Sequence, residues 1–595
     1  MKNYQFILKP MKNLKTIFIS ISTMVILLTT SCQDLTEINT SPNQLGASDI
    51  NIKYVLTSVL SSTSTNYIRG QVYGGGVGTT EAMQYLQRDY IDYSGPNTFA
   101  WGTQNFSSFN SSLINSQYMV DNAKSETLTD NQKYYEAVGR IMRSFWYGFM
   151  TSAWGDMPYS AAMKSKEGNF TPVYDAQKDI FKGILADLKS ANEILATVAS
   201  VDGASTADIM FAGDVLKWRK FANSLRLRFL LRLSEKLTDM SAASLDVKSE
   251  FNTIVNNSTT YPIFTSNSDN AAISYIGTDS SNGWYGGPLG WNNRSEFYRR
   301  KPCKTFVNAL RDNGDPRLTT FIRPVDVQLR VSTTATGYAK LSDGQIVLNV
   351  SPAQVGTASI DTARYVGLPA AMGAPDLYNL SSLTNLNTIK SLNSSIYVDA
   401  AANPNVSYLA DIYAKDASSL VKAVYMSYTE LCFILAEARL KGWITASTAV
   451  DYYKAGIVAS LRQYSITDGS NLIYNTKTHA LTAYSESAFL ADLNTKFTNA
   501  ASDDDRLGQL MNQKWIAGFM TPEFWFDWRR TGQPNFGANL ISGNNGTKIP
   551  VRYGYGSEDG VLNSANLASA IAKLSPATND HWSKIWLLQG STKPW

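Results

Sequence analysis

The residues that most clearly suggest chemistry are aromatic side chains set in glycine- and asparagine-rich sequence. Residues 282–293 read NGWYGGPLGWNN and contain Trp284, Tyr285 and Trp291. Glycine lets a backbone turn freely, the flat faces of Trp and Tyr can stack on the apolar faces of sugar rings, and an amide such as Asn292 can bond hydroxyl groups. We predict that these four residues bind a ligand. The alternative is that the tryptophans pin the loop to the protein body.

A second group of aromatic and polar residues lies nearer the N-terminus. Residues 85–101 include Arg88, Tyr93, Asn97 and Trp101. Aromatic rings close to an arginine and an amide are typical of a saccharide platform. We predict that these residues also contribute to the ligand site, although Arg88 could instead lie on a helix face.

The sequence shows no pattern typical of a catalytic or metal site. It has two histidines, His479 and His581, and its three cysteines do not have metal-ligand spacing. Asp503 to Asp505 lack the alternating ligands of a calcium loop, so we expect them to begin a helix. We expect neither a metal nor a cofactor, and we predict a binding protein rather than an enzyme. Cys303 and Cys432 are expected to be small buried residues.

The N-terminus has the layout of an export signal. Four lysines precede an apolar run at 17–28, and small residues then lead into Cys32. A cysteine directly after a cleavage point suggests a bacterial lipoprotein, in which the thiol is acylated. We therefore predict a signal peptide at 1–31, lipidation at Cys32 and a lipidated tether at 32–50, so that the protein contacts the membrane through its lipid.

The net charge also depends on this signal. The chain has 53 basic and 49 acidic residues, and the four lysines of residues 1–31 leave 49 of each in the remainder. The balanced mature chain gives no support for a nucleic-acid-binding face.

Helical periodicity identifies the elements that must position the aromatic segments. Apolar residues recur at three- and four-residue steps in several stretches, which are residues 131–150, 175–195, 215–236, 425–441 and 446–464. Antiparallel pairs of such helices suggest stacked hairpins of the tetratricopeptide kind. Residues 251–420 are richer in Ser, Thr, Asn and Gly, and are expected to form loops and small strands. We predict a mainly α fold, with one domain over 51–595.

Several motifs occur in the order found in one known family. They are Trp154-Gly155-Asp156-Met157-Pro158-Tyr159, the stretch from Gly213 to Arg228, Asp315-Pro316-Arg317, Glu430 with Ala436-Glu437-Ala438, and Gln513-Lys514-Trp515 with Arg529-Arg530-Thr531-Gly532. Because of these motifs and their order, the chain resembles the SusD/RagB family of Bacteroidetes outer-membrane lipoproteins along nearly its whole length.

The resemblance implies a tetratricopeptide-like helical scaffold with a loop-rich, minor-β ligand face. It also implies a surface-facing outer-membrane lipoprotein that binds a nutrient, a glycan in the first instance, and passes it unchanged to a SusC-like TonB-dependent transporter. Three alternatives stay open at this point. They are an oligopeptide ligand, a surface glycoside hydrolase with a carboxylate pair, and a structural lid that holds no ligand itself.

Overall fold

The fold is described from a computed structural model. It describes residues 51–73, 78–89, 95–122, 129–290, 295–356, 360–373, 375, 378–379, 403–476, 480–540 and 548–593. The chain divides into two compact units, Met1–Tyr54 and Val55–Trp595. The predicted signal, tether and Cys32 lie outside the described residues. The residues of the candidate site belong to the second unit.

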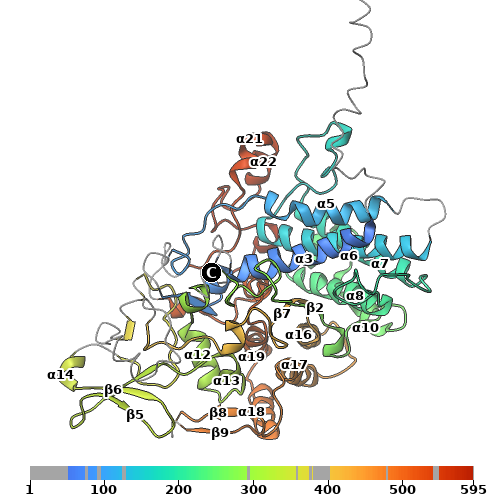
Figure 1. Cartoon of the computed structure of the whole chain (residues 1–595). Helices are drawn as coiled ribbons and strands as arrows, with labels where there is room; N and C mark the ends of the chain where they lie inside the picture. Colours follow the sequence, from blue (N-terminus) through green and yellow to red (C-terminus); the bar gives the residue numbers. More distant parts are fainter. Residues whose placement is uncertain are drawn as a thin grey trace, which may run out of the picture. The chain divides into compact units, whose positions relative to one another are not determined.

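Long helices form the scaffold, in two groups (Figure 1). The first group comprises α3 (Ile52–Thr63), α5 (Ser107–Asp121), α6 (Asp130–Trp154), α7 (Gln177–Leu195), α8 (Val215–Arg232), α9 (Leu237–Ala242) and α10 (Val247–Asn256). The second comprises α16 (Tyr428–Leu440), α17 (Ala449–Gln463), α18 (Glu486–Thr498), α19 (Asp503–Ala517) and α20 (Phe524–Thr531). The short helices α21 (Ser557–Leu562) and α22 (Ser564–Ile571) lie apart from this group, at the top of Figure 1. Consecutive helices pack together in the order α5–α6–α7–α8, and α16 packs on α17. The prediction of a mainly α, tetratricopeptide-like scaffold is confirmed.

Helix α6 shows how the sequence builds this scaffold. It begins at a capping box, in which Thr129 and Gln132 satisfy each other's backbone N–H groups. It ends at Gly155, whose φ of 105° suits glycine. Between them, Gly139 and Gly148 leave room for neighbouring helices, because a Cβ at either position would overlap α5 or the ring of Phe229 on α8. These glycines therefore set how closely α5 and α8 approach α6.

The predicted helix boundaries need two corrections. Asp175 does not cap α7; its carboxylate instead accepts hydrogen bonds from the backbone N–H groups of Tyr159 and Ser160, at 3.0 and 2.9 Å. Tyr425 belongs to a strand, and α16 starts after Ser427, whose side chain accepts from Glu430 N. Ser502 caps α19 in the same way, so the prediction that Asp503 to Asp505 begin a helix is confirmed.

The rest of the described chain contains short strands and short helices, many of them within the loop-rich residues 251–420. The strands form four small sheets: β1 (Leu86–Arg88) with β3 (Arg300–Pro302), β2 (Ala271–Ser274) with β7 (Lys422–Met426), β5 (Gly337–Lys340) and β4 (Val327–Val331) on either side of β6 (Ile346–Val350), and β8 (Leu472–Tyr474) with β9 (Leu481–Ala483). All pairs are antiparallel except β4 with β6. The short helices are α4 (Thr79–Ala82), α11 (Ser295–Arg299), α12 (Lys304–Arg311), α13 (Arg317–Phe321) and α14 (Pro352–Val355).

Buried ion pairs join the two groups of helices. Arg228 on α8 donates twice to Glu430 on α16, at 2.7 and 2.6 Å, and Arg232 pairs with Glu523 just before α20. Within the second group, Arg530 on α20 pairs with Glu437 on α16. All three arginines are buried, and their acidic partners come from segments distant in sequence.

The two cysteines of the described portion are buried and free, as expected. Burial raises the pKa of both Cys303 and Cys432 to about 12, so both stay protonated thiols at neutral pH.

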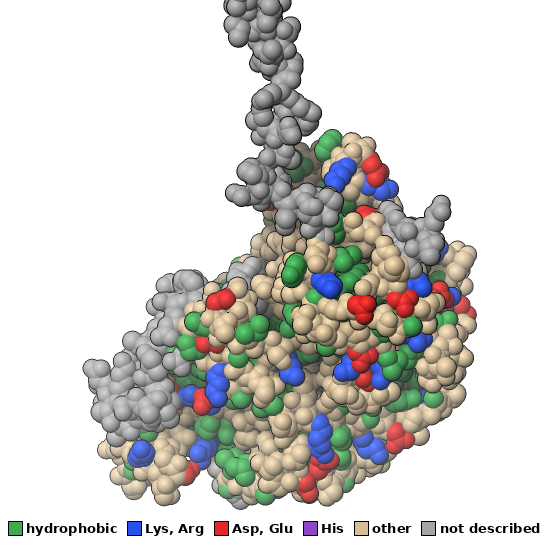
Figure 2. Space-filling model, turned by 45° about the vertical axis from the view of Figure 1, so that its right-hand side comes forward, with side chains coloured by type: hydrophobic (Ala, Val, Ile, Leu, Met, Phe, Trp, Pro, Cys, Tyr) green, Lys and Arg blue, Asp and Glu red, His purple; other side chains and the backbone are tan. Residues whose placement is uncertain are grey.

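Charges are mixed on the visible surface. On the face shown in Figure 2, Lys and Arg side chains are interspersed with Asp and Glu rather than gathered by sign. Within the described part of the chain, no helix is both long and apolar enough to span a bilayer.

The carboxylate of Asp527 offers a test of how much the buried ion pairs stabilise the fold. Burial would raise its pKa, but Lys514 (2.6 Å) and Arg530 (2.9 Å) lower it below the usual range. Removing one partner of a buried pair typically costs about 3–5 kcal/mol. We therefore expect Asp527→Asn to lower the free energy of unfolding by about that amount at pH 7, measured by urea denaturation.

The pH dependence of the stability lost in Asp527→Asn follows from the direction in which the Asp527 pKa is shifted. Because the folded-state pKa lies below the unfolded value of about 3.9, the stabilisation is fully present at neutral pH and declines as the pH falls below about 4 toward the folded-state pKa. The difference between wild type and Asp527→Asn should thus be constant from about pH 8 to pH 5. If the difference in unfolding free energy changed between about pH 8 and pH 5, a lowered pKa for Asp527 would be contradicted.

Candidate ligand-binding site

A two-stranded ribbon brings the two predicted aromatic segments together. In the β1–β3 pair Arg88 lies opposite Arg300, and Asp89 N donates to Arg299 O at 3.1 Å. Because the strands are antiparallel, the chain leaving β1 and the chain entering α11 and β3 lie at the same end of the ribbon. Segments about two hundred residues apart in sequence are therefore anchored side by side.

Four buried charges hold this end of the ribbon. Arg300 pairs with Glu81 at 2.9 Å and with Glu296 at 3.2 Å, and Arg88 lies 3.8 Å from each of these carboxylates. Burial lowers the pKa of the Arg88 guanidinium and Arg300 lowers it further, whereas Glu81 and Glu296 oppose this. Two arginines alternating with two carboxylates keep the cluster neutral, so it can stay buried.

The predicted ligand residue Asn97 closes the first loop. Its side-chain amide accepts from Arg88 N at 2.7 Å and donates to Arg88 O at 2.8 Å, and the side chain is fully buried. This pairing continues the β1 edge and ties the end of the loop to its beginning. Asn97 and Arg88 thus hold the base of the segment and have no exposed group with which to contact a ligand.

The second segment is pinned to residues much later in the chain. Trp284 is 1% exposed, and its indole N–H donates to Tyr413 O at 3.0 Å. Its backbone N–H donates to Asp416 O at 2.6 Å, and the Asp416 carboxylate accepts from Leu289 N at 2.7 Å. This arrangement agrees with the alternative that Trp284 anchors the loop, whereas Tyr285 is only half-buried and Leu289 is 41% exposed.

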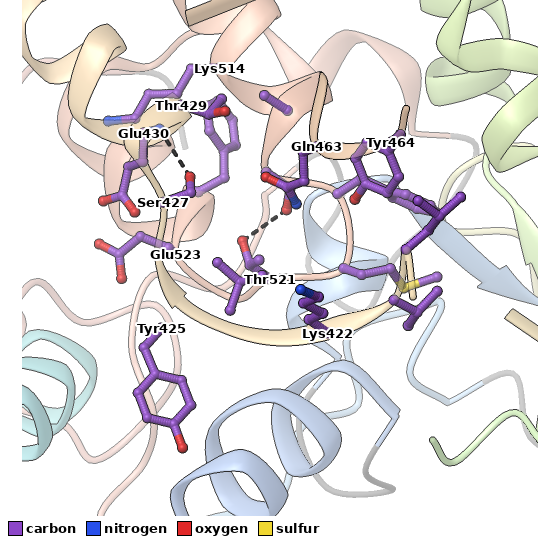
Figure 3. A pocket seen from close by; sticks show the side chains of 18 of the residues that line it. Lys422, Tyr425, Ser427, Thr429, Glu430, Gln463, Tyr464, Lys514, Thr521 and Glu523 are labelled. Carbon is purple, nitrogen blue, oxygen red and sulfur yellow. Dashed lines mark hydrogen bonds between the residues drawn. The ribbon is translucent and has the colours of Figure 1, made fainter. Parts of the chain in front are cut away.

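A small cavity lies beneath the Trp284 anchor. Its wall includes Trp284 and Tyr413 together with residues of β7, α16, α17, α19 and the start of α20, and its volume is about 50 Å³. Figure 3 shows Glu430 and Glu523 on one side, with Lys422, Thr521 and Gln463 near one another on the other. Ligand pockets usually measure about 300–1,000 Å³, so this space suits ordered water rather than a sugar ring. The buried Thr429 hydroxyl, which has no partner in the described structure, lines it.

The remaining predicted residues divide into two groups. Trp101 is 7% exposed and packs edge to face with Trp525 and Tyr553, so it belongs to the core. Tyr93, Trp291 and Asn292 lie outside the described residues. The sequence indicated the two segments, but it gave no signal for Asp416 or Tyr413, which lie more than a hundred residues from the loop they hold. Glu296 and Arg300 had only their four-residue spacing as a signal.

Comparison with known proteins identifies the family. A family model described as starch-binding and associating with the outer membrane matches residues 47–556. The chain belongs to the SusD-like family. This confirms the resemblance deduced from the motifs, and associates the family, as its description states, with starch binding and the outer membrane.

Solved structures of SusD homologues share the fold. One from Bacteroides fragilis has 25% identity and a TM-score of 0.63, and another from the same organism has 21% identity and a TM-score of 0.66. A chitin-binding protein has 21% identity and a TM-score of 0.64. Each alignment covers 91% of this chain and 100% of the other. A search of curated proteins finds no match.

Gly287 tests whether Asp416 holds the SusD-like chain's second aromatic segment. A Cβ at Gly287 would overlap the backbone and side chain of Asp416. We expect Gly287→Ala to open the contact and to raise the hydrogen-exchange rates of the Trp284 and Leu289 amides at least about tenfold. Gly560→Ala is the matched control, because its nearest contact is an ordinary 3.9 Å. Unchanged protection in Gly287→Ala would show that the loop is held by other contacts.

Proposed function

We propose that this SusD-like chain binds a glycan nutrient non-covalently and delivers it to a SusC-like TonB-dependent transporter. The observation that carries the proposal is the β1–β3 ribbon, which anchors two aromatic segments at one end. Family membership supports nutrient binding at the outer membrane, and a chitin-binding protein shares the fold. The ligand residues proposed are Tyr285, Trp291, Asn292 and Tyr93.

The mechanism requires recognition but no bond breaking. Sugar rings would stack on Tyr285, Trp291 and Tyr93, while the Asn292 amide would bond hydroxyl groups. The buried charges at Glu81 and Arg300 and the Asp416 anchor restrain both loops before the ligand arrives. Restraint of this kind lowers the entropy lost on binding and so strengthens affinity.

The anchor and the partner complete the proposal. An acyl chain on Cys32 would hold the protein at the outer membrane, on the cell surface, with residues 33–50 as the tether. Held there, the protein would meet the transporter in the plane of the membrane, where a shared surface raises the effective concentration of both.

Binding of the chain beginning at Gln33 to a panel of polysaccharides and oligopeptides tests this function. We expect selective binding of a glycan, measured by isothermal titration calorimetry. We expect Tyr285→Ala/Trp291→Ala to weaken it at least about tenfold, because removal of central aromatic contacts commonly costs about 2 kcal/mol or more.

The control replaces an aromatic residue elsewhere on the surface. Phe170 is 74% exposed and lies in the connection between α6 and α7, so Phe170→Ala should leave glycan affinity unchanged. Binding of peptides alone would replace the glycan with an oligopeptide ligand. Release of reducing ends from a bound polysaccharide would overturn the binding-only function.

A further inference from the structure

A second, larger cavity lies on the helical scaffold. Its volume is about 510 Å³, and it is formed by α5, α6, α7 and the connection between α6 and α7. It shares no lining residue with the cavity beneath Trp284. Its volume falls within the usual range of about 300–1,000 Å³ for small-molecule sites.

Arg143 is the main polar group of this cavity. One terminal nitrogen donates to the Gln117 amide oxygen at 2.5 Å and the other to Asp187 at 2.5 Å. Arg140 holds the second oxygen of Asp187 at 2.8 Å, which fixes that carboxylate between two arginines. The Nε–H of Arg143 is buried and has no acceptor among the described residues. A guanidinium held by partners on two sides forms a rigid, planar part of the cavity wall.

Two tyrosines and a restrained connection form the rest of the wall. Tyr147 and Tyr159 stand edge to face, with ring centroids 4.7 Å apart. The ring of Tyr159 occupies the space next to Gly183 that a Cβ would fill. The connection itself is tied down where the Asp175 carboxylate accepts from Ser160 Oγ at 2.6 Å. The cavity is thus shaped by the fold.

The charges of the wall indicate what kind of ligand fits. Arg143 and Lys164 are offset by the carboxylates of Asp121, Glu167 and Asp187. A phosphate or sulfate would require an excess of positive charge, which this wall does not have. Planar polar groups beside aromatic rings suit a neutral ligand that carries hydroxyls.

We propose that this cavity is a second ligand site, which takes a neutral sugar of mono- or disaccharide size. It is separate from the two aromatic segments, so it goes beyond the function proposed above. Its ligand would lie against the fixed Arg143 side chain and pack against Tyr147 and Tyr159.

Ala186 allows the cavity to be blocked from an exposed position. It lines the cavity, is exposed on α7 and takes part in none of the ion pairs. Titration of the chain beginning at Gln33 with glucose, maltose, cellobiose, lactose and chitobiose, followed by ligand-observed NMR, should detect at least one bound sugar. Ala186→Trp should weaken that binding at least about tenfold. Arg143→Lys keeps the positive charge near Asp187 but removes the planar guanidinium from the cavity wall, and should also weaken the binding.

The controls separate this site from the proposed glycan platform. Ala196 is exposed at the end of the same helix and does not line the cavity, so Ala196→Trp should bind as wild type does. Tyr285→Ala/Trp291→Ala should keep the small-sugar binding even where it loses the polysaccharide. The proposal is overturned if no sugar of the panel binds, or if Ala186→Trp binds as tightly as Ala196→Trp while both melt at the wild-type temperature.

Discussion

The structure depends on paired charges buried between helices that are distant in sequence. Arg228 and Arg232 on α8 meet Glu430 and Glu523, and Arg530 on α20 meets Glu437. Each charge would be costly in the interior alone, and each is acceptable because its partner is supplied by another segment. The pairing requires the two groups of helices to dock in one arrangement. Apolar packing is non-directional, so by itself it would restrict the docking geometry of the helices less.

The same principle supports the candidate binding site at a smaller scale. Glu81, Arg88, Glu296 and Arg300 form a neutral buried cluster at the β1–β3 ribbon. The ribbon has only three residues in each strand, and so short a pair has little stability in isolation. Charges from α4 and α11 therefore stabilise the ribbon, and with it the starting points of both aromatic segments.

The aromatic residues have two distinct roles that their surroundings in sequence did not reveal. Trp101 and Trp284 are anchors, with buried rings packed against other aromatic residues. Tyr285, the direct neighbour of Trp284, is only half-buried. Alternation of this kind is expected where a loop needs one side chain to fix it and leaves the next toward solvent. The sequence located these aromatic residues, and packing decided the direction in which each of them faces.

The sequence alone determined the helical scaffold, the family and the segments of interest, because helix periodicity, caps and motif order are local properties. Helices α6 and α8 begin within one residue of the predicted positions, directly after the caps Thr129 and Asp214. Only the tertiary structure decided that Asp416 holds the Trp284 loop, that Arg143 is fixed in the wall of a cavity, and that Asn97 closes a loop. Each of these depends on groups that are distant in sequence or on burial, and local pattern carries no information about either.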